Sequence, residues 1–175
     1  MDPSQNVFVW HDGDVYKALS EFTHEVAFQS DRAQPAIQRA LAAMGGRGGV
    51  VTLGRGDFVL DAPLALHDNV WLRGSGRGTR LLVPGHNGEG IGVMCRDVKG
   101  AAVSDLALAP QADRSAAVGI VVDNAGDCKV RDLAVVGFAD YGVWVRNNAF
   151  LCEVRGCSLA GNGRANLYFD QLARG

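Results

Sequence analysis

The sequence has little that would place the chain in a membrane or on nucleic acid. No apolar run approaches the length that spans a bilayer. The 17 basic and 19 acidic residues are interspersed and give a net charge of −2, so there is no electrostatic footprint for a phosphate backbone. We therefore expect neither a membrane nor a nucleic acid as a partner.

The four cysteines show no C-x-x-C spacing and no nearby histidine cluster, so a zinc site is not indicated. We expect no metal and no other cofactor. Free cysteine often behaves as a small buried apolar residue, and we expect that role here. Cys128 and Cys152 precede equivalent valines by two residues and should stack in one column, where a disulfide is conceivable but not expected.

The first residues also lack the basic and apolar segments of a secretory leader. The compartment is therefore left open, and an extracellular location would require that a leader had been removed. With 175 residues, 47% of them hydrophobic, the chain has enough apolar material for one core. We expect its 23 glycines to serve turns.

Two short apolar phrases alternate along the chain at a near-constant interval. The first begins at Val103, Val130 and Val154, with intervals of 27 and 24 residues. The second is led by glycine and begins at Gly92, Gly119 and Gly142, and loosely at Asn166. A period in the twenties indicates a solenoid, in which each repeat buries its apolar side chains against its neighbours.

The segments between the phrases decide which solenoid is expected. Residues 123–127 and 146–149 are turn formers without helical periodicity, so each coil is predicted to be strand, turn, strand. This pattern predicts an all-β parallel β-helix. A leucine-rich repeat, whose return leg would be helical, remains the alternative.

The first 46 residues have a different organisation. Asp12-Gly13 lies between two apolar runs and predicts a β-hairpin, followed by a strand over residues 25–28. A helix capped by Ser30 or Asp31 should then end at Gly45-Gly46. Its apolar stripe comprises Ala36, Ile37, Ala40, Leu41 and Met44. We expect residues 1–46 to cap the solenoid and residues 47–175 to form its coils.

Residues 31–85 resemble the N-terminal region of the pectate-lyase superfamily of right-handed β-helix proteins. The motifs are a helix with A-I-Q (36–38), then G-G-V-V (48–51), G-D-F-V-L (56–60) and N-V-W-L-R-G-S-G (69–76). The resemblance implies a right-handed, single-stranded parallel β-helix. It also implies a superfamily of polysaccharide lyases, glycoside hydrolases and uronan epimerases, with phage tailspikes and non-catalytic members beside them.

The catalytic signatures of that superfamily are absent from this sequence. Tyr141-Gly142-Val143 is not followed by the Asp-Pro-His motif of the alginate epimerases, and the Asp-Asp and Gly-His-Gly elements of polygalacturonases are missing. Fold alone does not choose a function, so the candidate site must come from the repeats.

Strand alternation places two columns of side chains outside the glycine-led strands. They are Met94, Val121, Trp144 and Tyr168, and Arg96, Asp123, Arg146 and Asp170. The second column alternates in charge, which is typical of a ladder that fixes strand register. Trp144 and Tyr168 should be exposed together, which is costly unless a ligand such as a sugar ring covers them.

These columns supply the candidate site residues. Asp123 and Asp170 should lie two coils apart, roughly 9 to 10 Å, as the carboxylates of an inverting glycosidase do. Arg146 lies between them and would neutralise a uronate carboxylate in a lyase or epimerase. Arg96, Trp144 and Tyr168 would bind substrate. Opposite charges should lower the pKa of the two aspartates, which argues against a general acid.

The sequence therefore predicts a carbohydrate-active or carbohydrate-binding β-helix acting on a polysaccharide. The alternative is a non-catalytic structural or adhesive β-helix, such as a segment of a phage tail fibre or surface protein. No capping element follows the last phrase. We expect either further coils beyond the chain end or self-association through that end.

Overall fold

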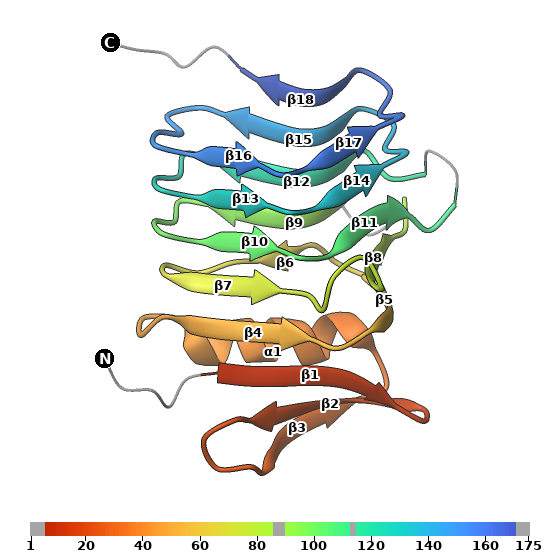
Figure 1. Cartoon of the computed structure of the whole chain (residues 1–175), viewed down its shortest axis with the longest axis vertical. Coiled ribbons are helices and arrows are strands. Elements are labelled where there is room, and N and C mark those ends of the chain that lie inside the picture. The colour runs from red at the N-terminus through yellow and green to blue at the C-terminus, as the bar shows by residue number, and fades with distance from the viewer. Residues whose placement is uncertain (1–5, 86–89, 113–114, 171–175) are drawn as a thin grey trace.

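The computed structural model describes residues 6–85, 90–112 and 115–170. It shows an all-β parallel β-solenoid of about four turns, with one helix at its N-terminal end (Figure 1). Each coil contributes one strand to each of three sheets, which we call sheets A, B and C. Parallel pairing joins every strand to its counterpart in the next coil.

The strands of the coils follow one another in the order A, B, C. Sheet A contains β4 (Gly49–Leu53), β7 (Val70–Arg73), β10 (Ala102–Ser104), β13 (Lys129–Arg131) and β16 (Glu153–Arg155). Sheet B contains β5 (Gly56–Val59), β8 (Thr79–Val83), β11 (Ala107–Pro110), β14 (Ala134–Val136) and β17 (Ser158–Ala160). Sheet C contains β6 (Leu64–Ala65), β9 (Ile91–Arg96), β12 (Val118–Asp123), β15 (Tyr141–Arg146) and β18 (Ala165–Phe169).

The solenoid is right-handed. In Figure 1 the chain crosses the near face from left to right in β13, returns from right to left across the far face in β15, and rises toward the C-terminus as it winds. This hand is the one that parallel β-connections almost always adopt.

The predicted columns are in register. Val103, Val130 and Val154 pair in sequence across sheet A, and their side chains fill the interior because alternate residues point inward. Val93, Ile120, Val143 and Leu167 pair likewise across sheet C. The described residues after α1 contain no helix, which excludes the leucine-rich alternative.

The prediction of two strands per coil is wrong, because the first phrase bends in its middle. Val103-Ser104 ends β10 and Ala107 begins β11, with Asp105 between them at φ 56°. Asp132 and Gly156 take the same left-handed conformation at φ 53° and 65° one and two coils later. Aspartate and glycine adopt it most readily, so each phrase turns a corner and supplies two strands.

The leading glycines of the second phrase lie within strands, not in turns as expected. An added Cβ on Gly92, Gly119 or Gly142 would lie 2.7, 2.6 and 2.6 Å from the carbonyl oxygen of the residue stacked on the next coil. These glycines recur because the backbones of successive coils approach closely at this corner.

Replacing Gly119 by alanine should therefore destabilise the protein by about 1 to 3 kcal/mol through overpacking. Thermal unfolding measures the loss. Gly78→Ala is the matched control, because its nearest contact would be an ordinary 3.6 Å from a flexible arginine side chain. Equal melting temperatures for the two variants would contradict this explanation of the repeat.

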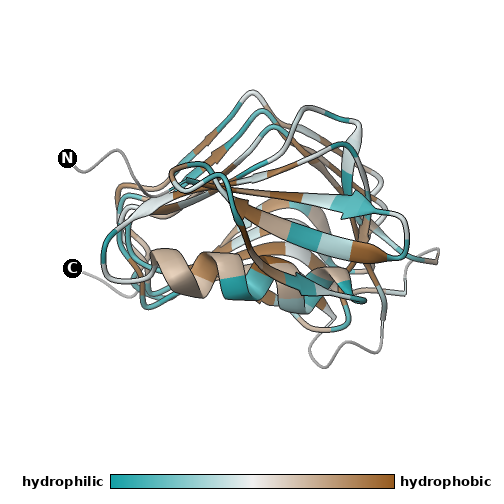
Figure 2. Ribbon diagram, turned by 90° about the horizontal axis from the view of Figure 1, so that it is seen from below, coloured by the Kyte–Doolittle hydropathy of each residue, from teal (hydrophilic) through white to brown (hydrophobic). Residues whose placement is uncertain are grey.

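The cap consists of β1 (Asn6–Asp12), β2 (Val15–Ser20), β3 (Val26–Ser30) and α1 (Ala33–Met44). The predicted hairpin forms around Gly13, and β1 pairs in parallel with β4, so the hairpin extends sheet A. Figure 2 shows α1 and the hairpin lying across the end of the solenoid. Within the described residues, no helix is long and apolar enough to cross a membrane.

The predicted apolar stripe of α1 is buried: Ala36, Ile37, Ala40, Leu41 and Met44. The helix ends at Gly45 as expected, but its N-cap is Arg32, which makes no side-chain capping bond. The prediction that Ser30 or Asp31 caps the helix is wrong. The Ser30 hydroxyl accepts a hydrogen bond from the Arg32 amide (3.1 Å), which lies before the first turn of the helix.

At the opposite end, two side chains on β18 are left open to solvent. Leu167 and Phe169 follow the inward columns of sheet C but are 37% and 54% exposed. Self-association through this end stays a prediction.

Candidate functional site

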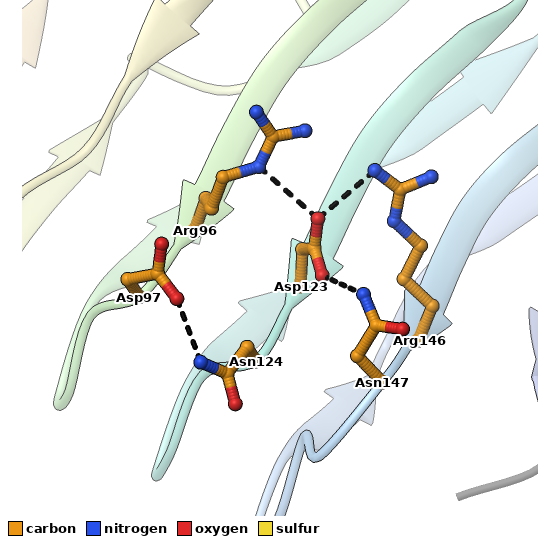
Figure 3. A network of polar contacts seen from close by, with 6 residues as sticks. All are labelled: Arg96, Asp97, Asp123, Asn124, Arg146 and Asn147. Atoms are coloured by element: carbon orange, nitrogen blue, oxygen red, sulfur yellow. Dashed lines mark hydrogen bonds and ion pairs between the residues drawn. The ribbon is translucent and has the colours of Figure 1, made fainter.

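Asp123 forms the centre of a three-coil ion-pair network on sheet C. Its Oδ2 accepts hydrogen bonds from Arg96 Nε (3.1 Å) and Arg146 Nη2 (2.9 Å), and its Oδ1 accepts one from Asn147 Nδ2 (Figure 3). Arg96 and Arg146 lie directly opposite Asp123 on the neighbouring strands. The predicted charge column is therefore present at these three positions.

The carboxylate of Asp123 is nearly buried, with 8% of the side chain exposed. Burial raises the pKa of Asp123, but the bonds from Asn147, Arg146 and Arg96 outweigh it and lower that pKa overall. The expected direction is confirmed for this residue. A general acid needs a raised pKa, so these contacts favour a structural ion-pair centre.

Asp170, the predicted second carboxylate, directly follows β18. Its main-chain amide donates to the carbonyl oxygen of Val145 (2.8 Å), which holds it one coil beyond Arg146. An acid and base pair formed by Asp123 and Asp170 stays a prediction, and the three bonds on Asp123 do not favour it.

The aromatic column on sheet C is in register but more covered than expected. Trp144 pairs with Val121 and Tyr168, yet Val121 is fully buried and Trp144 is partly buried. Only Tyr168, at 39%, matches the expected exposure. Trp144 is covered by its neighbours, because Tyr141 lies 5.1 Å from its ring and the Arg146 guanidinium 4.3 Å above it.

These side chains form a second, outer apolar cluster. Its members are Ile91, Met94, Val118 and Val121, with Ala117, Tyr141 and Trp144 packed against them. Ile91, Val118 and Tyr141 share one column and precede the corner glycines. The bend at those glycines turns this column toward the outer face, where it packs beside Met94, Val121 and Trp144. Strand alternation alone predicts that the column points inward.

A turn ladder next to the ion-pair network orders the same edge of sheet C. Asp97, Asn124 and Asn147 directly follow β9, β12 and β15 in the left-handed conformation. Asn124 Nδ2 donates to Asp97 Oδ1 (2.7 Å). Asn124 and Asn147 belong to the segments 123–127 and 146–149 that the sequence marks as turn formers.

A further hollow lies on the other side of the coil, on the outer face of sheet A. It is a groove of about 1110 Å³. Its lining includes three cations, an indole ring and two small polar side chains: Arg47, Lys129, Arg131, Trp71, Asn69 and Ser104. Trp71, Ala102 and Lys129 form one outward column, and Ser104 and Arg131 belong to the next.

Hydrogen bonds fix the floor of this groove. Trp71 Nε1 donates to Ser104 Oγ (3.0 Å), and Ser104 Oγ donates to Asp105 Oδ2 (2.6 Å). Arg131 is held by Glu153 of the next coil, and the Arg73 guanidinium lies 5.7 Å from the centre of the Trp71 ring. Because the Trp71 indole and the Arg131 guanidinium are already held in place, a ligand would find a partly prepared surface.

Apolar spacing does not reveal this groove, because the short strands of sheet A lie inside the first phrase. Ser104 and Arg131 lie between the apolar residues of that phrase. The signal was present in W-L-R (71–73), K-V-R (129–131) and E-V-R (153–155), where polar or aromatic residues flank one inward residue.

The cysteines behave as expected. Cys95 and Cys128 are buried, Cys152 and Cys157 are partly buried, and all four are free thiols. The contact with Cys152 lowers the pKa of Cys128, but Cys95 and burial raise it, to about 12 in all, so the thiol is inert at neutral pH. Among the described residues, no group of three or more metal-ligating side chains is placed to hold an ion.

Together the fold and the groove define a parallel β-solenoid with a cation-lined outer face. No family model matches the chain, and no curated protein matches it significantly, so membership of the pectate-lyase superfamily is not confirmed. Among solved structures, ORF18 of Geobacillus virus E2 is similar at a TM-score of 0.43 and 14% identity. The alignment covers 73% of this chain and 38% of that protein.

Proposed function

We propose that this protein is a carbohydrate-binding β-helix module that holds an acidic polysaccharide in the groove on sheet A. The observation that carries the proposal is the lining of the groove. Arg47, Lys129 and Arg131 line the groove together with Trp71, and the described lining residues include no carboxylate. Lys129 and Arg131 pair with Asp127 and Glu153, which lie outside the lining. Such a surface attracts carboxylate or sulfate groups through charge-assisted hydrogen bonds.

The indole ring supports a sugar as the ligand. Trp71 is partly exposed at the floor of the groove and its Nε1 is already bonded to Ser104. The apolar face of a pyranose ring can therefore cover the indole without leaving its N–H unpaired. The resemblance of residues 31–85 to the pectate-lyase superfamily supports the same class of ligand.

Binding without hydrolysis is the activity that this lining supports. A glycoside hydrolase needs two carboxyl groups on either side of the scissile bond, and the described residues of the groove supply none. On sheet C, the Asp123 carboxylate is occupied by three donors.

Isothermal titration with oligogalacturonides tests the proposal, with maltooligosaccharides of equal length as the neutral comparison. We expect binding of the acidic chains alone, and a loss of about tenfold or more in affinity for Trp71→Ala. Tyr168→Ala removes an exposed aromatic ring from sheet C and should leave affinity unchanged.

Two results would count against the proposal. One is equal binding of acidic and neutral chains, or no loss of affinity in Trp71→Ala. The other is growing absorbance of unsaturated products during incubation, which would reveal a lyase instead of a binding module.

A further inference from the structure

The outer face of sheet A continues beyond the groove onto the N-terminal cap. Because β1 pairs in parallel with β4, Phe8 lies opposite Thr52, and Thr52 lies opposite Arg73. These three residues form one outward column that runs from the hairpin toward the groove. Arg73 Nη2 donates to Thr52 Oγ1 (3.3 Å), so the column is polar and cationic between the two regions.

A second hollow of about 460 Å³ lies on this face of the cap. Its lining consists of Phe8, Trp10, His11, Leu19, Gly54 and Arg55. Val7 and Val9 point into the core, so alternation directs Phe8 and Trp10 outward. Both rings are only partly buried. Their centres are 5.8 Å apart and their planes differ by 21°.

Gly54, which has no side chain, lets Phe8 and Trp10 lie close to the backbone. A Cβ on Gly54 would lie 3.3 Å from both Phe8 Cζ and Trp10 Cβ. The next residue, Arg55, is exposed at the rim. The second hollow thus repeats the composition of the groove on sheet A, with aromatic rings on the floor and a cation beside them.

We propose that this hollow is a second subsite for the same acidic polysaccharide, so that the cap takes part in binding. This inference rests on the proposed function. One sugar ring of the ligand would stack on Phe8 and Trp10, with its acidic group at Arg55, while another occupies Trp71. The ligand crosses Thr52 and Arg73 between the two subsites.

The distance between the subsites sets the length of ligand that can use both. Phe8 is two strands away from Trp71 and two residues further along the strand direction, which is roughly 12 Å, and Trp10 is roughly 16 Å away. A short oligosaccharide can occupy only one subsite. A longer one gains affinity from the second subsite, because its binding there is intramolecular.

Affinity measured against oligogalacturonide length tests the inference. For the wild type we expect affinity to rise by about tenfold or more once the chain is long enough to span both subsites. Trp10→Ala and Arg55→Ala should remove that rise and leave the affinity for the shortest bound chain unchanged. Arg55 is exposed, so its variant provides a test if Trp10→Ala disturbs the hairpin.

The control is Phe22→Ala, which removes an aromatic side chain that is 65% exposed elsewhere in the cap. It should behave as the wild type. If the wild type binds and both subsite variants keep the full dependence on length, the second subsite is refuted. If the wild type binds no acidic chain of any length, the proposed function itself fails.

Discussion

Replacing Asp123 by alanine should lower the free energy of unfolding by about 3 kcal/mol, because two arginines would lose a buried counter-ion. The value lies near the lower end of the usual range for a broken buried pair, since the Arg96 side chain is 40% exposed and its charge is partly screened. Urea unfolding followed by circular dichroism measures the loss.

Asp57→Ala is the matched control for this prediction. Asp57 also pairs with one arginine, Arg80, at 2.5 Å, but both side chains are about half exposed, at 43% and 55%. Such surface pairs contribute at most about 1 kcal/mol. A loss at Asp123 no greater than at Asp57 would contradict a structural role for the network on sheet C.

The same network gives the stability a dependence on pH. The folded protein lowers the pKa of Asp123 below its ordinary value of 3.8. The carboxylate therefore contributes its stabilisation above that value and loses it as the pH falls through the folded pKa. The difference in unfolding free energy between wild type and Asp123→Ala should be constant near neutral pH and shrink below about pH 4.

Reversing two charges in the groove should abolish most of the binding. The double variant Arg47→Glu with Lys129→Glu replaces attraction by repulsion at two positions of the lining. We expect affinity for an acidic oligosaccharide to fall by about a hundredfold, equivalent to about 2.7 kcal/mol. Wild-type affinity should also weaken as salt is added, because exposed charges are screened.

The control for this variant is Arg32→Glu with Arg164→Glu. These arginines lie outside the groove, have side chains that are 65% and 69% exposed, and give the same change in net charge. If the control lost as much affinity as the groove variant, binding would depend on overall charge and not on the groove.

The columns of the solenoid could be predicted because inward residues must repeat. Val103, Val130 and Val154 are apolar at a steady interval since each can bury its side chain only against its neighbours along the axis. The buried stripe of α1 followed from the same logic at helical spacing.

The third strand of each coil could not be found from apolar spacing alone. The corner at Asp105 needs a single left-handed residue, and aspartate at such a position is indistinguishable in sequence from an exposed strand residue. The cover over Trp144 was missed for a related reason. The bend at Gly142 turns the Tyr141 side chain toward the outer face of sheet C, where it contacts Trp144. Strand alternation alone predicts that Tyr141 points into the core.

The candidate site shows the limit of the sequence most clearly. Arg96, Asp123 and Arg146 lie together as predicted, but their spacing in sequence does not show that three donors of the protein hold the Asp123 carboxylate. Trp71 and Lys129 were not grouped at all. They lie 58 residues apart in sequence and share a column only because β10 stands between β7 and β13.

The central claim is that the ligand lies on the outer face of sheet A, and amide hydrogen exchange with and without a bound oligogalacturonide tests it most directly. We expect slower exchange on binding at the lining segments 47–50, 69–71 and 100–104, with no change in β15 or β18. Slower exchange confined to β15 and β18, around Trp144 and Tyr168, would place the ligand on sheet C and contradict the account.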